Sequence, residues 1–300
     1  MRKYTIPGIL AAFALLCASC TVDEVDRSVT VVSSEHTART ALDAWLDANY
    51  RIPYNIDFKY RFEDIEGDYD YYLVPARYDE SIKMAHLVKY LCVEAYDEVA
   101  GVDFTRAYFP KMFFLEGDFE YNANNTMVLG TAEGGKKIIL MGVNYLSSIL
   151  SQHDAGLLNE YYFKTIHHEF THILNQTKDY PTAFQQVTGS GYVADNWSTN
   201  PYALEYLEFG FISAYSQKEA REDFAEMLST YVINPQSTWD RFLSQAGTSG
   251  RAAIQAKLEI VRNYMRDSWG IDIDELRAVI LRRQDEILSG RVDITDLTVR

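Results

Sequence analysis

Residues 167–172 read His-His-Glu-Phe-Thr-His and contain the pattern His168-Glu169-x-x-His172. On a helix, side chains four positions apart lie on one face, about 5–6 Å from each other. Two imidazoles at that spacing can bind one zinc ion, and a Glu directly after the first His can act as the base that activates a water. The pattern therefore predicts that His168 and His172 are zinc ligands and that Glu169 is the catalytic base.

The metal site needs a further protein ligand, because a catalytic zinc ion usually has three and one open position. A third His six residues after the second is excluded, since Lys178 stands there. The other option is a Glu from a second helix, and Glu222 and Glu226 lie one turn apart in the helical segment 219–232. One carboxylate can bind zinc while the other orients a ligand His through its second ring nitrogen. We predict Glu222 as the ligand and Glu226 as the orienting carboxylate.

Other residues are weaker candidates for the same site. Glu219 would share a helix face with the two carboxylates, and Glu205 and Glu208 lie in an aromatic stretch just upstream. Tyr215 is a candidate catalytic residue, because a phenol near the metal can donate a hydrogen bond to a developing oxyanion. Each assignment has a competing interpretation without a functional role. The acidic residues could form a solvated helix face, and Tyr215, one of 22 tyrosines, could be an ordinary core or surface residue.

The spacing of apolar residues predicts the elements that position these groups. Large apolar residues recur at three- and four-residue steps around the His-Glu-x-x-His motif, which predicts a helix between Asp154 and Pro181. The segments before it are predicted as helices at 40–50 and 81–99, strands at 54–62, 111–115, 126–129 and 137–141, and turns at 122–125 and 130–135, the last a glycine hairpin. The segments after it are predicted to be helical. Together they predict an α+β, zincin-like fold with a small mixed N-terminal sheet and a mostly helical C-terminal half.

Three segments carry a resemblance to a known family: 165–176 (TIHHEFTHILNQ), 210–215 (GFISAY) and 222–226 (EDFAE). They are similar to zinc-binding metallopeptidase lipoproteins, a family also called substrate import-associated zinc metallohydrolase lipoproteins. The resemblance extends over most of the chain, including 54–56 and 129–135. It implies a zinc cofactor and a genomic association with TonB-dependent importers and their surface glycan-binding lipoproteins.

The EDFAE block also resembles the Glu-bearing helix of anthrax lethal-factor-like gluzincins, whose first Glu binds zinc. This resemblance implies that Glu222, rather than Glu226, is the metal ligand. Some relatives have His where this chain has Asn175. The difference touches no predicted ligand and is expected to alter only the rim of the site.

The start of the chain predicts export and lipidation. Arg2 and Lys3 precede an apolar run that is too short for a typical membrane span, and small residues then lead to Cys20. We predict a lipoprotein signal peptide at 1–19, lipidation of Cys20, an acidic tether at 20–36 and a metallohydrolase domain at 37–300, with its sheet-bearing half at 37–176 and its helical half at 177–300. The expected location is the outer membrane, exposed at the cell surface. The alternatives are the periplasmic face and an unlipidated secreted product.

Charge and cysteine content narrow the possible partners. The chain has a formal net charge of −15, and removing the signal takes away Arg2 and Lys3 and no acid, which leaves −17. Repulsion from phosphate therefore disfavours nucleic acid binding.

Cys92 would be the only thiol left after lipidation, so we expect no disulfide and a buried, inert Cys92.

These observations predict a zinc metallopeptidase in which Glu169 takes a proton from a zinc-bound water as that water attacks a peptide carbonyl. Its expected partners are a peptide or protein substrate, the membrane through the lipid on Cys20, and a TonB-dependent importer with its surface lipoprotein. The alternatives are a non-catalytic, zinc-containing lipoprotein that binds glycans or peptides, and a zinc hydrolase of a non-peptide amide or ester.

Overall fold

The computed structural model describes residues 38–63, 74–121, 127–128, 130–133 and 137–299. Residues Thr40–Arg300 form one compact unit, to which the elements below belong. The predicted signal peptide and tether, Cys20 and the turn at 122–125 lie outside the described residues, so the predicted domain boundaries stay predictions. No described helix combines the length and the apolar character needed to cross a membrane.

The first helix begins at a capping box. The Thr40 side chain accepts a hydrogen bond from the Asp43 backbone N–H at 3.3 Å, and the Asp43 carboxylate accepts one from the Thr40 N–H at 2.6 Å. The helix runs through α2 (Ala41–Leu46), the π-turn η2 (Asp47–Arg51) and α3 (Ile52–Tyr54). It ends at Asn55, which adopts the left-handed conformation with φ 54°. The predicted helix at 40–50 is therefore present and ends four residues later, at Tyr54.

A second helical run covers the predicted segment 81–99. It consists of α4 (Tyr78–Val88), η4 (Lys89–Val93) and α5 (Glu94–Ala100), and it ends at Gly101, whose φ of 86° suits glycine. The short helix α6 (Val102–Tyr108) follows. Seven residues are too few to show a helical period, which explains why the sequence did not predict α6.

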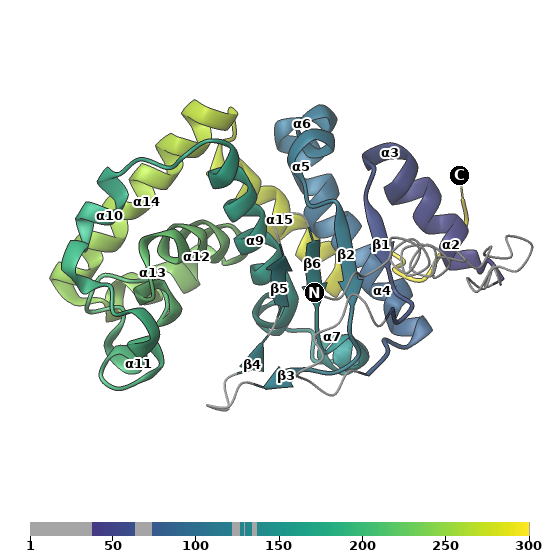
Figure 1. Ribbon diagram of the computed structural model, residues 1–300, viewed down its shortest axis with the longest axis horizontal. Helices are drawn as coiled ribbons and strands as arrows, with labels where there is room; N and C mark the ends of the chain where they lie inside the picture. The colour runs from purple at the N-terminus through teal and green to yellow at the C-terminus, as the bar shows by residue number, and fades with distance from the viewer. Residues whose placement is uncertain (1–37, 64–73, 122–126, 129, 134–136, 300) are drawn as a thin grey trace, which may run out of the picture. The chain divides into compact units, whose positions relative to one another are not determined.

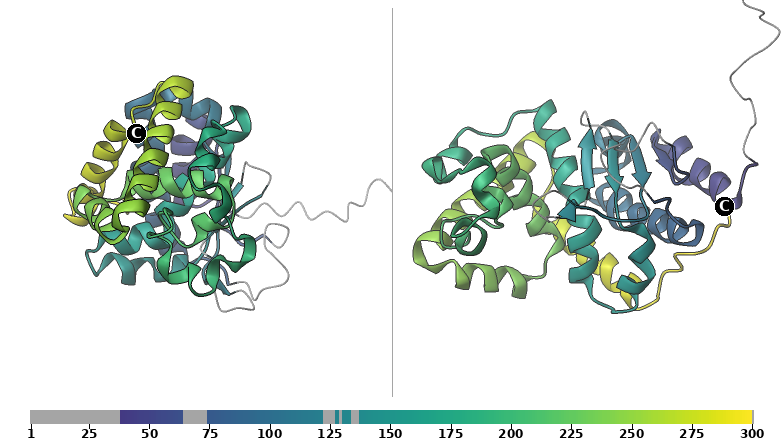
Figure 2. Two further views of the ribbon diagram at one scale, coloured as in Figure 1. Left: turned by 90° about the vertical axis from the view of Figure 1, so that its left-hand side faces the viewer. Right: turned by 60° about the horizontal axis from the view of Figure 1, so that its bottom comes forward.

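The sheet has four strands in the order β1-β2-β6-β5. β1 (Asp57–Lys59), β2 (Met112–Leu115) and β6 (Lys137–Leu140) are parallel, whereas β5 (Gly130–Glu133) runs antiparallel along the edge next to β6. Figures 1 and 2 show these strands side by side. A separate antiparallel pair joins β3 (Glu120–Tyr121) and β4 (Met127–Val128). The predicted mixed sheet is thus confirmed.

Two strand predictions differ from the structure in detail. The segment 54–62 alternates as expected, with Ile56, Phe58 and Tyr60 buried, but only three of its residues pair with β2. The segment 130–135 was predicted as a glycine hairpin, and β5 does run antiparallel to the next strand, β6; what the sequence did not predict is that β5 is the edge strand of the four-stranded sheet. Its Gly-Thr-Ala-Glu sequence has low strand propensity, so its pairing with the strongly strand-forming β6 decides its conformation.

The remaining chain is mostly helical, as predicted. After η5 (Val143–Tyr145) and α7 (Leu146–Leu150), a continuous helix comprises α8 (Ala155–Leu158), η6 (Asn159–Phe163) and α9 (Lys164–Thr177). The elements that follow are α10 (Ala183–Val187), η7 (Gly189–Gly191), η8 (Ala194–Ser198), α11 (Tyr202–Glu205), η9 (Tyr215–Gln217), α12 (Ala220–Ile233), α13 (Gln236–Gln245), α14 (Gly247–Trp269) and α15 (Ile273–Leu288).

Helix α12 is the centre of the helical half. Every residue from Glu222 to Ile233 is buried, because α12 packs against α9, α14 and α15. α9 also contacts the edge strand β5, so it lies between the sheet and α12 (Figure 1). A helix that is buried on all sides is rigid, and its buried carboxylates require partners of their own.

Candidate metal centre

The helix that carries the His-Glu-x-x-His motif starts where the sequence predicts. Asp154 caps α8 by accepting a hydrogen bond from the Gly156 N–H at 2.7 Å. The π-turn η6 then leads directly into α9, and such turns are frequent at functional sites. Ile166, Phe170 and Leu174 bury one stripe of α9 in the core. The opposite face presents the motif to α12.

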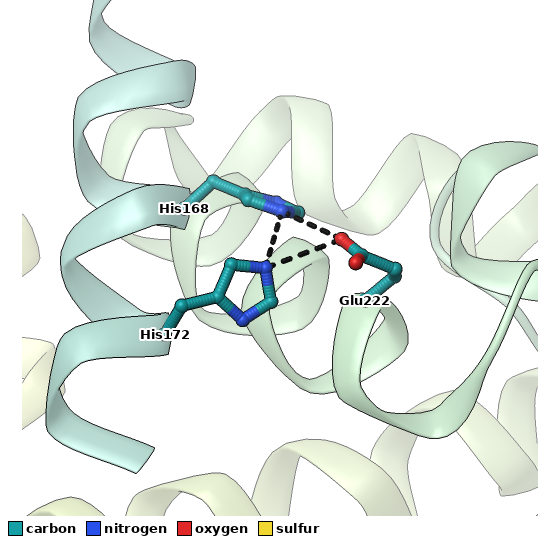
Figure 3. A group of neighbouring side chains, drawn as sticks. All are labelled: His168, His172 and Glu222. Atoms are coloured by element: carbon teal, nitrogen blue, oxygen red, sulfur yellow. Dashed lines mark hydrogen bonds and ion pairs between the residues drawn. The ribbon is translucent and has the colours of Figure 1, made fainter. Parts of the chain in front are cut away.

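His168 and His172 from α9 and Glu222 from α12 each place one potential ligand atom next to the other two (Figure 3). The two Nε2 atoms of His168 and His172 lie 3.0 Å apart, and Oε2 of Glu222 lies 3.0 Å and 3.2 Å from them. Ligands of a tetrahedral zinc ion, each about 2.0 Å from the metal, lie about 3.3 Å apart. The three atoms therefore fit around one zinc ion without a change of backbone.

The second carboxylate of α12 fixes the orientation of His168. Nδ1 of His168 donates to Oε1 of Glu226 at 2.9 Å. In the neutral imidazole that a metal ion requires, this hydrogen bond keeps the proton on Nδ1 and the lone pair on Nε2, the atom that faces Glu222 and His172. Nδ1 of His172, by contrast, is buried without a hydrogen-bond partner among the described residues. The two imidazoles thus differ in how firmly the protein holds them.

The electrostatics of the cluster favour charged carboxylates. Burial alone would raise the pKa of Glu222, but the imidazoles of His168 and His172 hold it well below its usual range. Burial likewise opposes ionisation of Glu226, and Lys164 and His168 hold its pKa well below the usual range. Burial would lower the pKa of His168, but its hydrogen bonds to the two carboxylates raise it to about 9 in the metal-free protein.

Glu169 lies close enough to the cluster to feel the charges of His168, His172 and Glu222, and its carboxylate makes no hydrogen bond within the part of the chain that the structure describes. Burial raises its pKa, and the nearby charges of His168 and His172 counteract part of that shift. A partly buried carboxylate with a raised pKa is a better proton acceptor than a solvated one. This position suits the base predicted from the sequence.

Tyr215 also lies at the cluster. Its ring centroid is 6.1 Å from that of His168, and Trp197 packs edge-on against it at 5.1 Å. Burial and the charges of Glu222 and Glu226 raise the pKa of its phenol. The phenol therefore stays protonated and can donate a hydrogen bond.

The weaker ligand candidates are not part of the cluster. Glu205, the last residue of α11, and Glu208, just after it, are both exposed, and neither belongs to the His168–His172–Glu222 group. Glu219 was expected to share a face with Glu222, but α12 begins only at Ala220. Glu219 is extended and exposed, and its carboxylate accepts a hydrogen bond from Arg221 at 2.8 Å.

Two further residues of the predicted motif are buried elsewhere. His167 faces away from the ligand pair, and its Nδ1 lies 3.2 Å from the Tyr96 hydroxyl; burial lowers the pKa of His167 to about 3. Asn175 is buried, and its amide has no partner among the described residues. Cys92 is buried and free, as predicted, and burial raises the pKa of its thiol.

The sequence did not indicate two residues that contact Glu226. Nζ of Lys164 lies 2.6 Å from Oε2 of Glu226, and the Ser213 hydroxyl donates to the same oxygen. Lys164 stands one helical turn before His168, and that spacing is the only signal in the sequence that could have indicated it.

Comparison with known proteins agrees with this geometry. A crystal structure described as a putative zinc-binding metallo-peptidase from Bacteroides caccae ATCC 43185 matches with a TM-score of 0.74 and 38% sequence identity, over 90% of this chain and 100% of that one. A search of curated proteins finds no match. Residues 35–274 match the family model described as putative zinc-binding metallo-peptidase. This chain therefore belongs to the putative zinc-binding metallo-peptidase family, and zinc is the metal its His–His–Glu set is expected to hold.

Proposed function

We propose that this zinc metallopeptidase hydrolyses peptide bonds with His168, His172 and Glu222 as metal ligands and Glu169 as general base. The observation that carries the proposal is the convergence of two Nε2 atoms and one carboxylate oxygen within 3.2 Å of one another, with a Glu directly after the first His. A structural zinc site needs no such base, which favours an enzyme over a binding protein that holds zinc only for its fold.

The roles of the chain's own groups follow from their positions. Zinc, when bound, acidifies a water and polarises the scissile carbonyl. Glu169 accepts a proton from the attacking water and delivers a proton to the leaving amine nitrogen. Tyr215, kept protonated, donates a hydrogen bond to the oxygen that becomes negative. Glu226 holds His168 in the orientation in which Nε2 faces the metal.

The test is a diverse peptide library incubated with zinc-loaded wild-type protein and with Glu169→Gln. We expect the variant to keep its zinc and its fold while cleavage falls by about 10²- to 10⁴-fold, since only the base is lost. Full activity of Glu169→Gln would contradict the assignment of the base. Hydrolysis of ester or non-peptide amide substrates, with no cleavage in the peptide library, would redirect the proposal to another zinc hydrolase.

We further propose that the protein is a lipoprotein anchored through Cys20 in the outer membrane, exposed at the cell surface and serving a TonB-dependent nutrient importer. The signal-like residues 1–19, the acidic segment after Cys20 and the family resemblance support this proposal. A Cys20→Ala variant should appear in the soluble fraction, whereas the wild type should incorporate labelled fatty acid. Protease treatment of intact cells then separates the two faces of the membrane, because a periplasm-facing protein would resist digestion.

A further inference from the structure

The Glu226 carboxylate is held by three donors from two separate segments. Its Oε1 accepts from His168, while its Oε2 lies 2.6 Å from the Lys164 ammonium and accepts from the Ser213 hydroxyl. Glu226 is 4% exposed, so water does not replace a lost donor easily. Because two donors hold Oε2, the carboxylate cannot rotate without losing both, and Oε1 remains directed at Nδ1 of His168.

Ser213 connects this carboxylate to the turn that carries Tyr215. Its oxygen accepts a hydrogen bond from the Ser216 backbone N–H at 3.1 Å and lies 3.1 Å from the Ser216 hydroxyl. Ser216 belongs to η9 together with Tyr215, whose ring packs near His168. The position of the Tyr215 turn and the orientation of His168 therefore depend on one carboxylate.

We propose that Lys164 and Ser213 are positioning residues of the metal centre, which act through Glu226 to fix the imidazole of His168 and the turn of Tyr215. The inference rests on the proposed zinc role of His168. Neither residue touches the ligand atoms, so each acts on the metal only through the carboxylate that it holds. Removing a direct partner of a ligand imidazole, such as Glu226, typically lowers metal affinity by about 10- to 100-fold, and we expect residues that act through Glu226 to have effects at the lower end of that range.

The chain offers a matched cluster of the same chemistry elsewhere. Glu80 on α4 is 2% exposed, lies 3.4 Å from the Lys83 ammonium and accepts a hydrogen bond from the Ser147 backbone N–H at 3.0 Å. The Ser147 hydroxyl also donates to Glu80. This second cluster of a lysine, a glutamate and a serine, in which Arg77 also lies 3.5 Å from Glu80, includes no ligand of the candidate metal centre. Its variants therefore report what the loss of such contacts does to stability alone.

The experiment compares Lys164→Met and Ser213→Ala with two controls. Lys83→Met removes the lysine of the matched cluster, and Ser229→Ala removes a hydroxyl that donates to the Glu226 backbone carbonyl at 3.3 Å, leaving the carboxylate untouched. Zinc affinity is measured by chelator competition, ligand geometry by the visible spectrum of the Co²⁺-loaded protein, and stability by the unfolding midpoint of the chelated protein.

We expect zinc affinity to fall by about tenfold in Lys164→Met and by a smaller factor in Ser213→Ala, with an altered Co²⁺ spectrum in each. Ser213→Thr, which keeps the hydroxyl, should restore both. The controls should lower the unfolding midpoint and leave zinc affinity within about twofold of wild type. If Lys164→Met does not fold, Lys164→Gln removes the charge and keeps a donor for the same comparison.

Wild-type zinc affinity and an unchanged Co²⁺ spectrum in Lys164→Met and Ser213→Ala, with only their stability reduced, would overturn the inference. That outcome would leave the proposed function standing if the wild type cleaves peptides. Conversely, weakened zinc binding in both variants, together with a wild-type protein that cleaves no peptide, would support the inference and contradict the proposed function.

Discussion

Two neighbouring carboxylates on α12, those of Glu222 and Asp223, have opposite surroundings. Asp223 is fully buried, and the ammonium of the equally buried Lys257 lies 2.6 Å from it. Glu222 instead faces the Nε2 atoms of His168 and His172 at 3.0 Å and 3.2 Å. Successive residues of a helix point about 100° apart, so one turn of α12 can serve both surroundings.

Lys257 makes further contacts besides its ion pair with Asp223. Its Nζ also donates to the carbonyl of Gly210 at 2.9 Å and lies 3.8 Å from the ring centroid of Phe211. The Tyr192 hydroxyl donates to Asp223 at 3.0 Å. Burial raises the pKa of Asp223 to about 6 against the attraction of Lys257, so the carboxylate is ionised and paired at neutral pH.

The comparison shows how to distinguish a structural carboxylate from a metal ligand in a buried helix. Both groups are buried acids, and burial of a charge is costly for each. Asp223 receives its compensating charge from a lysine of the chain. Glu222 is placed where its oxygen and two imidazole nitrogens form a ligand set for a cation. The identity of the partners, and not the degree of burial, indicates which carboxylate is the candidate metal ligand.

The largest effect is expected on the stability of the protein, when the ion pair of Asp223 with Lys257 is broken. Lys257→Met should destabilise the chelated protein by about 3–5 kcal/mol, because it leaves Asp223 buried without a counter-ion. Lys257→Met combined with Asp223→Leu should recover much of that loss, since an apolar pair of similar volume needs no compensation. Denaturant unfolding measures both. A loss below about 1 kcal/mol in the single variant would show that the pair is not a structural requirement.

A smaller effect is expected at the candidate metal centre, where zinc affinity should depend on pH. The pKa of His168 is raised to about 9 in the metal-free protein, so at pH 7 its imidazole carries a proton that zinc must displace. Apparent zinc affinity should therefore rise by about tenfold per pH unit above pH 7 and level off near about pH 9. Chelator competition across this range measures the slope. A flat profile would mean that His168 is already neutral at pH 7.

The smallest effect on zinc affinity is expected from Arg221, an exposed residue next to Glu222 in the sequence. Arg221 lies 3.7 Å from Oε1 of Glu222, and its side chain is 59% exposed. Exposed ion pairs contribute less than about 1 kcal/mol, so Arg221→Ala should change zinc affinity by no more than about fivefold. A tenfold loss would place Arg221 among the residues that position Glu222.

The two sides of α12 also differ in what the sequence could predict. The pair His168 and His172 is local, and helical spacing alone predicts its shared face. Glu222 followed from the exclusion of Lys178 and from the helical pattern around it. The contact of Asp223 with Lys257 spans 34 residues, and a lysine in a core position has no sequence signal. The spacing of residues along one helix predicts which side chains share a face, whereas the packing of the whole chain decides which helix faces contact each other.

The same limit applies to the fold and to the remaining site residues. The main helices and three of the sheet's strands follow from apolar spacing, but β5 depends on its pairing with β6. Lys164 and Ser213 lie 62 and 13 residues from Glu226, and only the packing of α9 and the η9 segment against α12 brings them together. Glu226 itself was predicted, since its spacing from Glu222 is local.

The most direct test of the difference between the two carboxylates is the zinc content of three purified variants: Glu222→Ala, Glu226→Ala and Asp223→Asn. We predict that Glu222→Ala loses its zinc, that Glu226→Ala binds zinc about 10- to 100-fold more weakly than wild type, and that Asp223→Asn retains about one zinc per chain. A Glu222→Ala protein that holds one zinc ion as tightly as wild type would contradict the assignment of Glu222 as the third ligand.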